Sequence, residues 1–307
     1  MPRARKGDHQ FGGEWTAQKL DVLAKYLVAY STALRDKPTP ENPFQKAFID
    51  GFAGTGSRVD SSTELDDESG QESLFSGEPA GESVESLRDG SARIALRTNP
   101  PFDKYIFIEQ SQQRCNQLED LKGEYPDLAE RVSILQGNAN DEIKRLCKRN
   151  WSAHRAVMFL DPYGMQVEWA TIEAIAATRA IDLWLLYPLG IGVNRLLTRT
   201  GVIPPGWQRR LTLLLGNEEW REEGYSVEKV TNLFGEDDEQ LTKTTMEVLG
   251  SRFNQRLATI FPGVAEPAGI LRNSRGTLLY LLCFAAANER GAPTALKIAN
   301  SLLRRLR

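Results

Sequence analysis

Short apolar runs alternate with stretches of helical periodicity along most of this 307-residue chain. Buried strands read as unbroken runs of β-branched, aromatic and aliphatic residues, whereas amphipathic helices repeat apolar residues every three to four positions. Five runs of the first kind predict strands, at residues 47–50, 104–109, 132–135, 156–160 and 181–186. Helical periodicity precedes or separates them, at residues 15–34, 91–96, 112–122 and 141–148. This alternation predicts a parallel, doubly wound α/β sheet.

The alternation breaks at two places. Residues from about 58 to 88 are rich in Asp, Glu, Ser and Gly, a composition that buries too little apolar surface to join a core. We expect a mobile acidic insertion there, inside an α/β core over residues 1–194. Residues 195–265 carry helical patches and acidic loops, which predict an inserted helical cap. Residues 266–307 complete the core with an antiparallel hairpin around Ser274-Arg275-Gly276 and a closing helix.

The composition narrows the environment and the partners. The three cysteines are scattered without a CxxC pair and there are two histidines, so we expect no metal site, no disulfide framework and a reducing compartment. No apolar stretch has the length of a membrane span, and the basic start lacks the apolar region of a signal peptide. We therefore expect a cytosolic protein with no membrane partner. A net charge of −3 gives no global attraction for nucleic acid, although a local basic cleft is compatible with it.

The tetrapeptide Asp161-Pro162-Tyr163-Gly164 directly follows the fourth apolar run. In an open α/β sheet, ligands bind at the carboxyl ends of the strands. The Asp161 carboxylate and the Pro162 carbonyl accept hydrogen bonds, and the Tyr163 ring offers a flat face for stacking. Two acceptors and a ring suit an exocyclic amine of a nucleobase. The same residues also fit a type I turn that closes the strand, with Asp first and Pro second.

A glycine-containing loop, Asp50-Gly51-Phe52-Ala53-Gly54-Thr55-Gly56, follows the first strand. Glycines at this point let the backbone turn tightly and approach a ligand closely. A phosphate-binding P-loop is disfavoured, because Ser57-Arg58 stands where Lys-Ser or Lys-Thr is required. A nicotinamide oxidoreductase is disfavoured too, because the loop lacks the GxGxxG spacing.

Polar residues also follow the second and third strands. Glu109 stands where nucleotide-binding α/β folds place a carboxylate for the ribose hydroxyls, and the acidic insertion explains its long distance from the glycine loop. Its alternative role is a solvated charge at the start of a helix. The amide of Asn138, with Ala139 beside it, is placed to bond an adenine amine. N-capping of the next helix by Asn140 or Asp141 is an equally natural use of this segment.

Further basic residues could bind a substrate phosphate. Asn194 and Arg195 follow the fifth strand and a Gly-containing stretch, so both could reach across the cleft. A turn with a solvated arginine explains them as well. The pairs Arg209-Arg210 and Arg304-Arg305 add to a local basic footprint, or they lie on solvated helix faces.

Two of these segments resemble methyltransferase motifs. Residues 48–56, Phe-Ile-Asp-Gly-Phe-Ala-Gly-Thr-Gly, resemble motif I of the class I S-adenosylmethionine-dependent methyltransferases, and Glu109 matches their ribose-binding acid. Asp161-Pro162-Tyr163 is similar to motif IV, Asp/Asn-Pro-Pro-Tyr/Phe, of amino-methyltransferases that act on nucleic acids, although it has one proline instead of two. With Gly164, the sequence Asp-Pro-Tyr-Gly resembles the tRNA guanine-N2 dimethyltransferases.

Over most of its length the chain resembles the three-Cys-motif partner (TcmP) family. The segments that carry this resemblance are residues 15–20 (WTAQKL), 48–56, 90–96 (GSARIAL), 159–165 (FLDPYGM), 181–190 (IDLWLLYPLG) and 193–197 (VNRLL). The resemblance implies a Rossmann-like class I methyltransferase sheet, mostly parallel with a C-terminal antiparallel hairpin. It also implies a partner protein with a three-cysteine motif, but it does not supply a substrate.

Together these features predict an S-adenosylmethionine-dependent methyltransferase. The cofactor would lie over the glycine loop, with its ribose held by Glu109 and its adenine near Asn138. Asp161 and the Pro162 carbonyl would then hold an amine nitrogen of a nucleobase in DNA or RNA, with Tyr163 stacked on the base. The alternative is a catalytically silent, methyltransferase-like binding subunit whose partner carries the activity.

Overall fold

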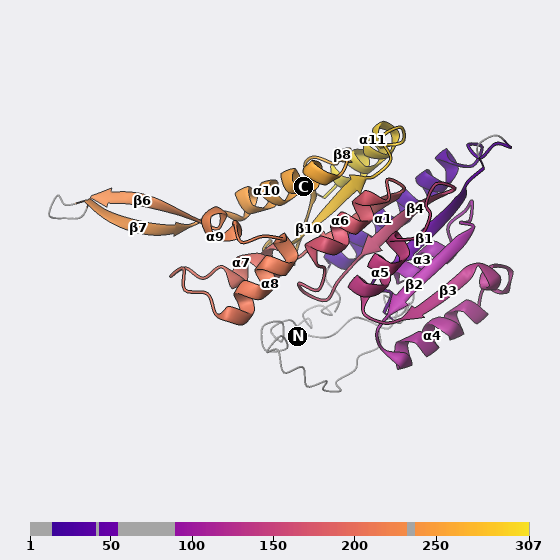
Figure 1. Cartoon of the computed structure of the whole chain (residues 1–307), viewed down its shortest axis with the longest axis horizontal. Helices are drawn as coiled ribbons and strands as arrows, with labels where there is room; N and C mark the ends of the chain where they lie inside the picture. The colour runs from indigo at the N-terminus through magenta and orange to yellow at the C-terminus, as the bar shows by residue number, and fades with distance from the viewer. Residues whose placement is uncertain (1–13, 41–42, 55–89, 232–236, 307) are drawn as a thin grey trace, which may run out of the picture.

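The computed structural model describes residues 14–40, 43–54, 90–231 and 237–306 (Figure 1). Its centre is an eight-stranded sheet in the order β3-β2-β1-β4-β5-β10-β8, with β9 paired to β10. The parallel strands are β1 (Gln45–Asp50), β2 (Lys104–Glu109), β3 (Val132–Gln136), β4 (His154–Leu160) and β5 (Ile181–Tyr187). The antiparallel strands are β8 (Gly263–Val264), β9 (Gly269–Arg272) and β10 (Leu278–Ala286).

The strand order reverses direction between β1 and β4. The carboxyl ends of these two neighbouring strands therefore form a topological switch point, where open α/β sheets bind their ligands. The parallel strands and the C-terminal hairpin of β9 and β10 lie where the sequence predicted them. The chain thus has the expected mostly parallel, Rossmann-like α/β sheet with an antiparallel C-terminal hairpin.

Helices cover both faces of the sheet (Figure 1). One face packs against α1 (Glu14–Ala33), α3 (Ser91–Leu96), α4 (Gln112–Gly123) and α11 (Ala292–Leu303). The other packs against α5 (Ala139–Cys147), α6 (Trp169–Ala177), α8 (Pro205–Leu215) and α10 (Met246–Ile260). Because both faces are covered, every residue of β5 is buried, as is every residue of β1 after Gln45. None of the helices in the described part of the chain combines the length and the apolar character needed to cross a membrane.

The sequence analysis did not identify α6. Two of its three exposed positions, Ala170 and Ala177, are alanines, so the sequence shows little of the polar face by which an amphipathic helix is recognised. Short helical turns complete the fold: η2 (Pro126–Arg131), η3 (Leu189–Val193), α7 (Asn194–Leu196) and α9 (Trp220–Glu223).

Residues 195–265 contain the helices predicted for this segment and, in addition, a two-stranded ribbon that the sequence analysis did not predict. Helices α8, α9 and α10 are present, but β6 (Tyr225–Thr231) and β7 (Asp237–Lys243) form a separate two-stranded antiparallel ribbon. The ribbon projects from the body of the molecule in Figure 1. Its first strand is rich in aromatic and β-branched residues, which favour extended structure. The predicted acidic insertion at about 58–88 lies outside the described residues.

Candidate active site at the carboxyl edge of the sheet

Three carboxylates meet at the switch point. Asp50 ends β1, Glu109 ends β2, and Asp161 is the first residue after β4. In the sheet, Asp50 pairs in register with Phe107 of β2 and with Phe159 of β4, so all three acids lie at one edge. Both Glu109 and Asp161 are close enough to raise the pKa of Asp50. The structure therefore brings together three residues that the sequence placed at separate strand ends.

Asp50 is fully buried at this edge. Its Oδ1 accepts a hydrogen bond from the Phe52 backbone N–H at 3.1 Å, whereas its Oδ2 has no hydrogen-bond partner among the described residues. Burial raises the pKa of Asp50 to about 7, and the negative charges of Asp161 and Glu109 add to this rise. The nearby Ser91 hydroxyl and the Phe52 amide act in the opposite direction. A buried acceptor without a partner is costly, and a ligand that donates a hydrogen bond would satisfy it.

The glycine loop crosses the ends of the neighbouring strands. The Gly51 N–H donates to the Phe159 carbonyl at 3.0 Å, and the Ala53 N–H donates to the Ile108 carbonyl at 3.0 Å. A Cβ at Gly51 would lie 2.4 Å from Leu160 Cδ2 and 3.1 Å from Ile143 Cδ1, so a larger residue would have to displace these buried side chains. The structure thus describes the first part of the loop; the predicted site residues Thr55 and Gly56 lie outside the described residues.

Gly54 has a different requirement from Gly51. Its φ of +59° lies in the left-handed region that favours glycine, and a Cβ at this position would meet no described atom within 4 Å. The conformation, rather than the packing, is therefore what selects glycine at this end of the loop.

Glu109 is buried, so the alternative of a solvated charge is wrong. Its Oε1 accepts a hydrogen bond from the Ser111 backbone N–H at 2.8 Å, just before α4 begins. Arg114 of the same helix approaches this oxygen with Nη1 at 3.7 Å. The carboxylate is thus held at the sheet edge by the start of α4, beside Asp50.

Asn138 caps α5, a role that the sequence analysis gave to Asn140 or Asp141. Its Oδ1 accepts hydrogen bonds from the backbone N–H groups of Asn140 at 2.9 Å and Asp141 at 3.4 Å. The oxygen that would accept a hydrogen bond from an adenine amine is therefore already engaged by the helix. Ala139, the other predicted residue here, is the first residue of the helix and is buried.

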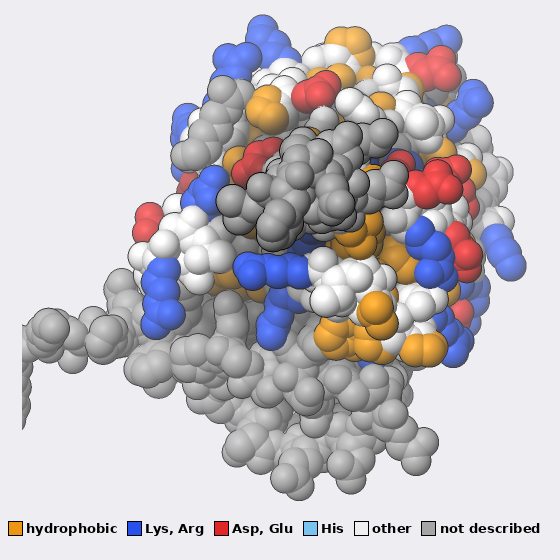
Figure 2. Space-filling view, turned by 90° about the vertical axis from the view of Figure 1, so that its left-hand side faces the viewer, with side chains coloured by type: hydrophobic (Ala, Val, Ile, Leu, Met, Phe, Trp, Pro, Cys, Tyr) orange, Lys and Arg blue, Asp and Glu red, His pale blue; other side chains and the backbone are white. Residues whose placement is uncertain are grey.

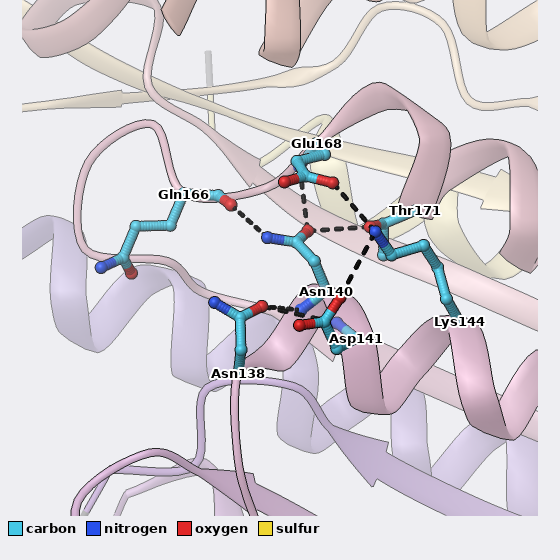
Figure 3. A network of polar contacts seen from close by, with 7 residues as sticks. All are labelled: Asn138, Asn140, Asp141, Lys144, Gln166, Glu168 and Thr171. Carbon is cyan, nitrogen blue, oxygen red and sulfur yellow. Dashed lines mark hydrogen bonds and ion pairs between the residues drawn. The ribbon is translucent and has the colours of Figure 1, made fainter.

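Asn140 joins α5 to the segment after Tyr163 (Figure 3). The buried side chain donates from Nδ2 to the Gln166 carbonyl at 2.8 Å. Its Oδ1 accepts from the Glu168 backbone N–H at 3.0 Å and from the Thr171 hydroxyl at 2.8 Å. Lys144 adds an ion pair to Glu168, with 3.1 Å between Nζ and Oε2. This network fixes the path of the chain between the predicted motif IV residues and α6.

The motif IV tetrapeptide forms an irregular connection. No backbone hydrogen bond joins the Gly164 N–H to the Asp161 carbonyl, so the hydrogen-bonded turn that was the alternative is not formed. Pro162 is buried, whereas the Tyr163 side chain is 64% exposed. Gly164 has a φ of +73°, in the left-handed region, which lets the chain reverse after the tyrosine. The ring of Tyr163 thus lies at the surface next to a buried strand end.

Lys19 is the functional candidate that the sequence analysis missed. Its Nζ lies 2.5 Å from Asp161 Oδ2, across 142 positions of the chain, and its side chain is only 2% exposed. The ammonium also lies 4.7 Å from the centre of the Trp15 ring, a cation–π contact. One pattern could have revealed it: Lys19 falls on the same helical stripe as the buried Trp15, Val22 and Leu23.

Asn194 and Arg195 follow β5 and the turn η3. A Cβ at Gly192 of this turn would lie 2.9 Å from Met165 Cγ, so η3 packs against the residue that follows the motif IV tetrapeptide. The Asn194 carbonyl accepts a hydrogen bond from Lys243, and Arg195 is exposed. Within the described part of the chain, no hydrogen bond or ion pair links either side chain to the three carboxylates.

Comparisons with known proteins give only distant likenesses. No protein-family model matches the chain, and no curated protein matches it. A solved Legionella pneumophila protein, described by the family model DUF519, is 11% identical with a TM-score of 0.42; the match covers 94% of this chain and 92% of the other. A Thermotoga maritima spermidine synthase is 11% identical with a TM-score of 0.36, covering 90% of this chain and 60% of the other.

The Streptomyces caelestis methyltransferase CcbJ is also similar in structure. It is 10% identical with a TM-score of 0.27, and the match covers 91% of this chain and 83% of that protein. Likenesses of this size carry no activity across. The chain has a Rossmann-like α/β fold with a carboxylate cluster at its switch point.

Proposed function

We propose that the protein is an S-adenosylmethionine-dependent methyltransferase that methylates an amine nitrogen of a nucleobase in DNA or RNA. The proposal includes a cytosolic location and a partner protein with a three-cysteine motif. The observation that carries it is the Asp50 Oδ2 atom, a fully buried acceptor without a described partner, beside the glycine loop at the switch point. This is where α/β folds bind nucleotide cofactors.

The residues at this edge fit S-adenosylmethionine. Its sulfonium and ammonium groups are cationic. Among the described residues at this edge there are three acids, Asp50, Glu109 and Asp161, and one buried lysine, Lys19. Glu109 would accept hydrogen bonds from the ribose hydroxyls, and Asp50 would accept one from a cofactor donor group.

The substrate side is formed by the motif IV residues. When bound, the cofactor supplies an electrophilic methyl group, and the electron pair of the broken C–S bond stays on its sulfur. An acceptor nitrogen forms the new N–C bond with its lone pair and then releases one proton to solvent. Asp161 and the Pro162 carbonyl would orient that nitrogen, and positioning alone can lower the barrier by several kcal/mol. The exposed Tyr163 would stack on a base that is extruded or single-stranded.

One observation bears on the proposed partner protein and another on the proposed nucleic acid substrate. Residues 15–20 are one of the segments that resemble the TcmP family, and Lys19 of this segment forms an ion pair with Asp161 at the candidate site. Lys and Arg side chains also gather beside apolar ones near the centre of the face in Figure 2. Such a local basic surface can contact phosphates even on a chain with a net charge of −3.

One observation favours a second candidate, the catalytically silent binding subunit. Lys19 already occupies one oxygen of Asp161, which leaves the acid with fewer acceptor positions for a substrate amine. Titration calorimetry with S-adenosylmethionine on the wild type and on Asp50→Asn separates the cases at the first step. If the wild type binds S-adenosylmethionine specifically and Asp50→Asn binds it more weakly, the result supports a cofactor site at this edge. If the wild type does not bind the cofactor, the proposed methyltransferase activity is wrong.

The reaction itself is tested on nucleosides from cells. Mass spectrometry would compare nucleosides from cells with the intact gene pair and cells in which Asp161 is changed to Ala. A methylated nucleoside present only in the first sample supports the proposed acceptor. Cofactor binding without any such nucleoside would move the assignment to the binding subunit or to another acceptor.

A further inference from the structure

Lys19 forms an ion pair that differs in kind from a surface salt bridge. Its side chain is 2% exposed and that of Asp161 is 21% exposed. Lys25 and Asp21 on the same helix also pair at 2.5 Å, but both of their side chains are well exposed. Burying an ammonium group is costly unless a partner compensates for it, so Lys19 needs Asp161 as a carboxylate.

The position of Lys19 is fixed by rigid elements. The ammonium lies over the ring of Trp15, four residues earlier on α1. That ring in turn packs against Tyr280 of β10, with 4.9 Å between ring centroids. A helix and a central strand therefore hold the lysine, which is the arrangement that preorganises a site.

We propose that Lys19 is a positioning residue for methyl transfer to an amine nitrogen, an inference that rests on the proposed function. The lysine holds Asp161 through Oδ2. This contact orients the carboxylate so that Oδ1 and the Pro162 carbonyl receive the N–H groups of the acceptor.

The other charges at this edge come from neighbouring elements. Asp50 and Glu109 end β1 and β2, and Arg114 of α4 approaches Glu109. Of the three acids, Asp161 is the one that Lys19 contacts, and it is the one on the proposed substrate side.

The test uses the full chain with its partner protein. The probes are S-adenosylmethionine with a tritiated methyl group and total nucleic acid from cells that lack the gene pair. Lys19→Met should lower methyl incorporation about 10²-fold, the size of effect that misplacement of a reacting group produces. Its dissociation constant for S-adenosylmethionine should stay within about threefold of the wild type, since the lysine faces the substrate side. Lys25→Met, the matched change on the exposed pair, should leave both quantities unchanged.

A lysine that acts through Asp161 has a further consequence. In an Asp161→Asn background, Lys19→Met should cause no additional loss of incorporation, because the group it positions is already absent. Lys19→Arg should recover part of the activity, since it keeps the charge. If Lys19→Met does not fold, Lys19→Gln, which keeps a hydrogen-bond donor without the charge, provides the same comparison.

The possible failures can be told apart. Parallel loss of cofactor affinity and incorporation, or an additive loss in the Asp161→Asn background, would show a purely structural lysine and overturn the inference. Incorporation by Lys19→Met and Lys19→Gln equal to that of the wild type would also overturn it, while the proposed function would stand. If the wild type neither binds the cofactor nor transfers methyl groups, the proposed function fails, and the inference with it.

Discussion

The Thr171 hydroxyl donates a hydrogen bond to Asn140 Oδ1 at 2.8 Å, which ties the first turn of α6 to the first turn of α5. The same oxygen accepts from the Glu168 N–H, and the amide nitrogen donates to the Gln166 carbonyl. One buried side chain thus satisfies three groups on the segment that follows the motif IV tetrapeptide. The path of the chain after residues 161–164 therefore depends on Asn140, an asparagine of a different element, α5.

Replacing Asn140 with Ala should therefore loosen the substrate side of the site. We expect a loss of about 2–4 kcal/mol in the free energy of unfolding, because buried partners are left without hydrogen bonds. Methyl transfer should fall more than cofactor affinity does. Urea unfolding and calorimetry measure these two effects. Asn116→Ala removes an exposed asparagine bonded to Gln112 and should change neither; an equally small effect of Asn140→Ala would contradict this role.

The positions of the parallel strands, and the sheet edge at which their carboxyl ends meet, could be predicted from the sequence. A sheet covered on both faces needs strands that are apolar throughout, and such runs stand out against helical periodicity. Parallel strands then place their carboxyl ends at one edge, which is why Asp50, Glu109 and Asp161 could be grouped before their geometry was known. The ribbon of β6 and β7 was not identified, because its two strands lie between helices, pair only with each other and lack the unbroken apolar run of a buried strand.

Long-range pairing of polar side chains could not be predicted. Lys19 and Asp161 are 142 positions apart, and nothing in either local sequence specifies the other. The same limit applies to the neighbouring Asn138 and Asn140. Either could cap α5 by its residue type, and only the packing of α6 against α5 decides that Asn140 turns inward and Asn138 caps the helix.

The ion pair predicts an unequal cost for removing its two members. Asp161→Asn leaves the 2% exposed ammonium of Lys19 without its charge partner and should cost about 3–5 kcal/mol of stability. Lys19→Met leaves a carboxylate that water reaches more easily, so it should cost less. The double variant should be more stable than Asp161→Asn alone. Chemical denaturation of the four proteins gives the coupling, and additive costs would show that the pair contributes nothing in solution.

The two glycines of the loop should respond differently to alanine. At Gly51 the added Cβ would meet Leu160 Cδ2 at 2.4 Å, and overpacking should cost about 1–3 kcal/mol of stability. At Gly54 no described atom lies within 4 Å of the added Cβ. The cost there comes from placing alanine in the left-handed conformation, which should lower the stability by about 1 kcal/mol. Gly54→Ala should still weaken S-adenosylmethionine binding by intruding on the ligand. Thermal unfolding and calorimetry compare the two variants; unchanged affinity in Gly54→Ala would place the cofactor elsewhere.

Asp50 predicts a pH dependence of stability. The pKa of an unfolded aspartate is about 3.9, and burial raises the pKa of Asp50 to about 7 in the folded chain. Between these values the folded state binds more protons, so this group makes the folded protein less stable as the pH rises. Asp50→Asn removes that loss, and its stability relative to the wild type should be about 2–3 kcal/mol higher at pH 8 than at pH 5. Urea unfolding at both pH values measures this difference. The exposed Asp120→Asn should show none, and a pH-independent effect of Asp50→Asn would mean that Asp50 is already ionised in the folded protein at pH 5.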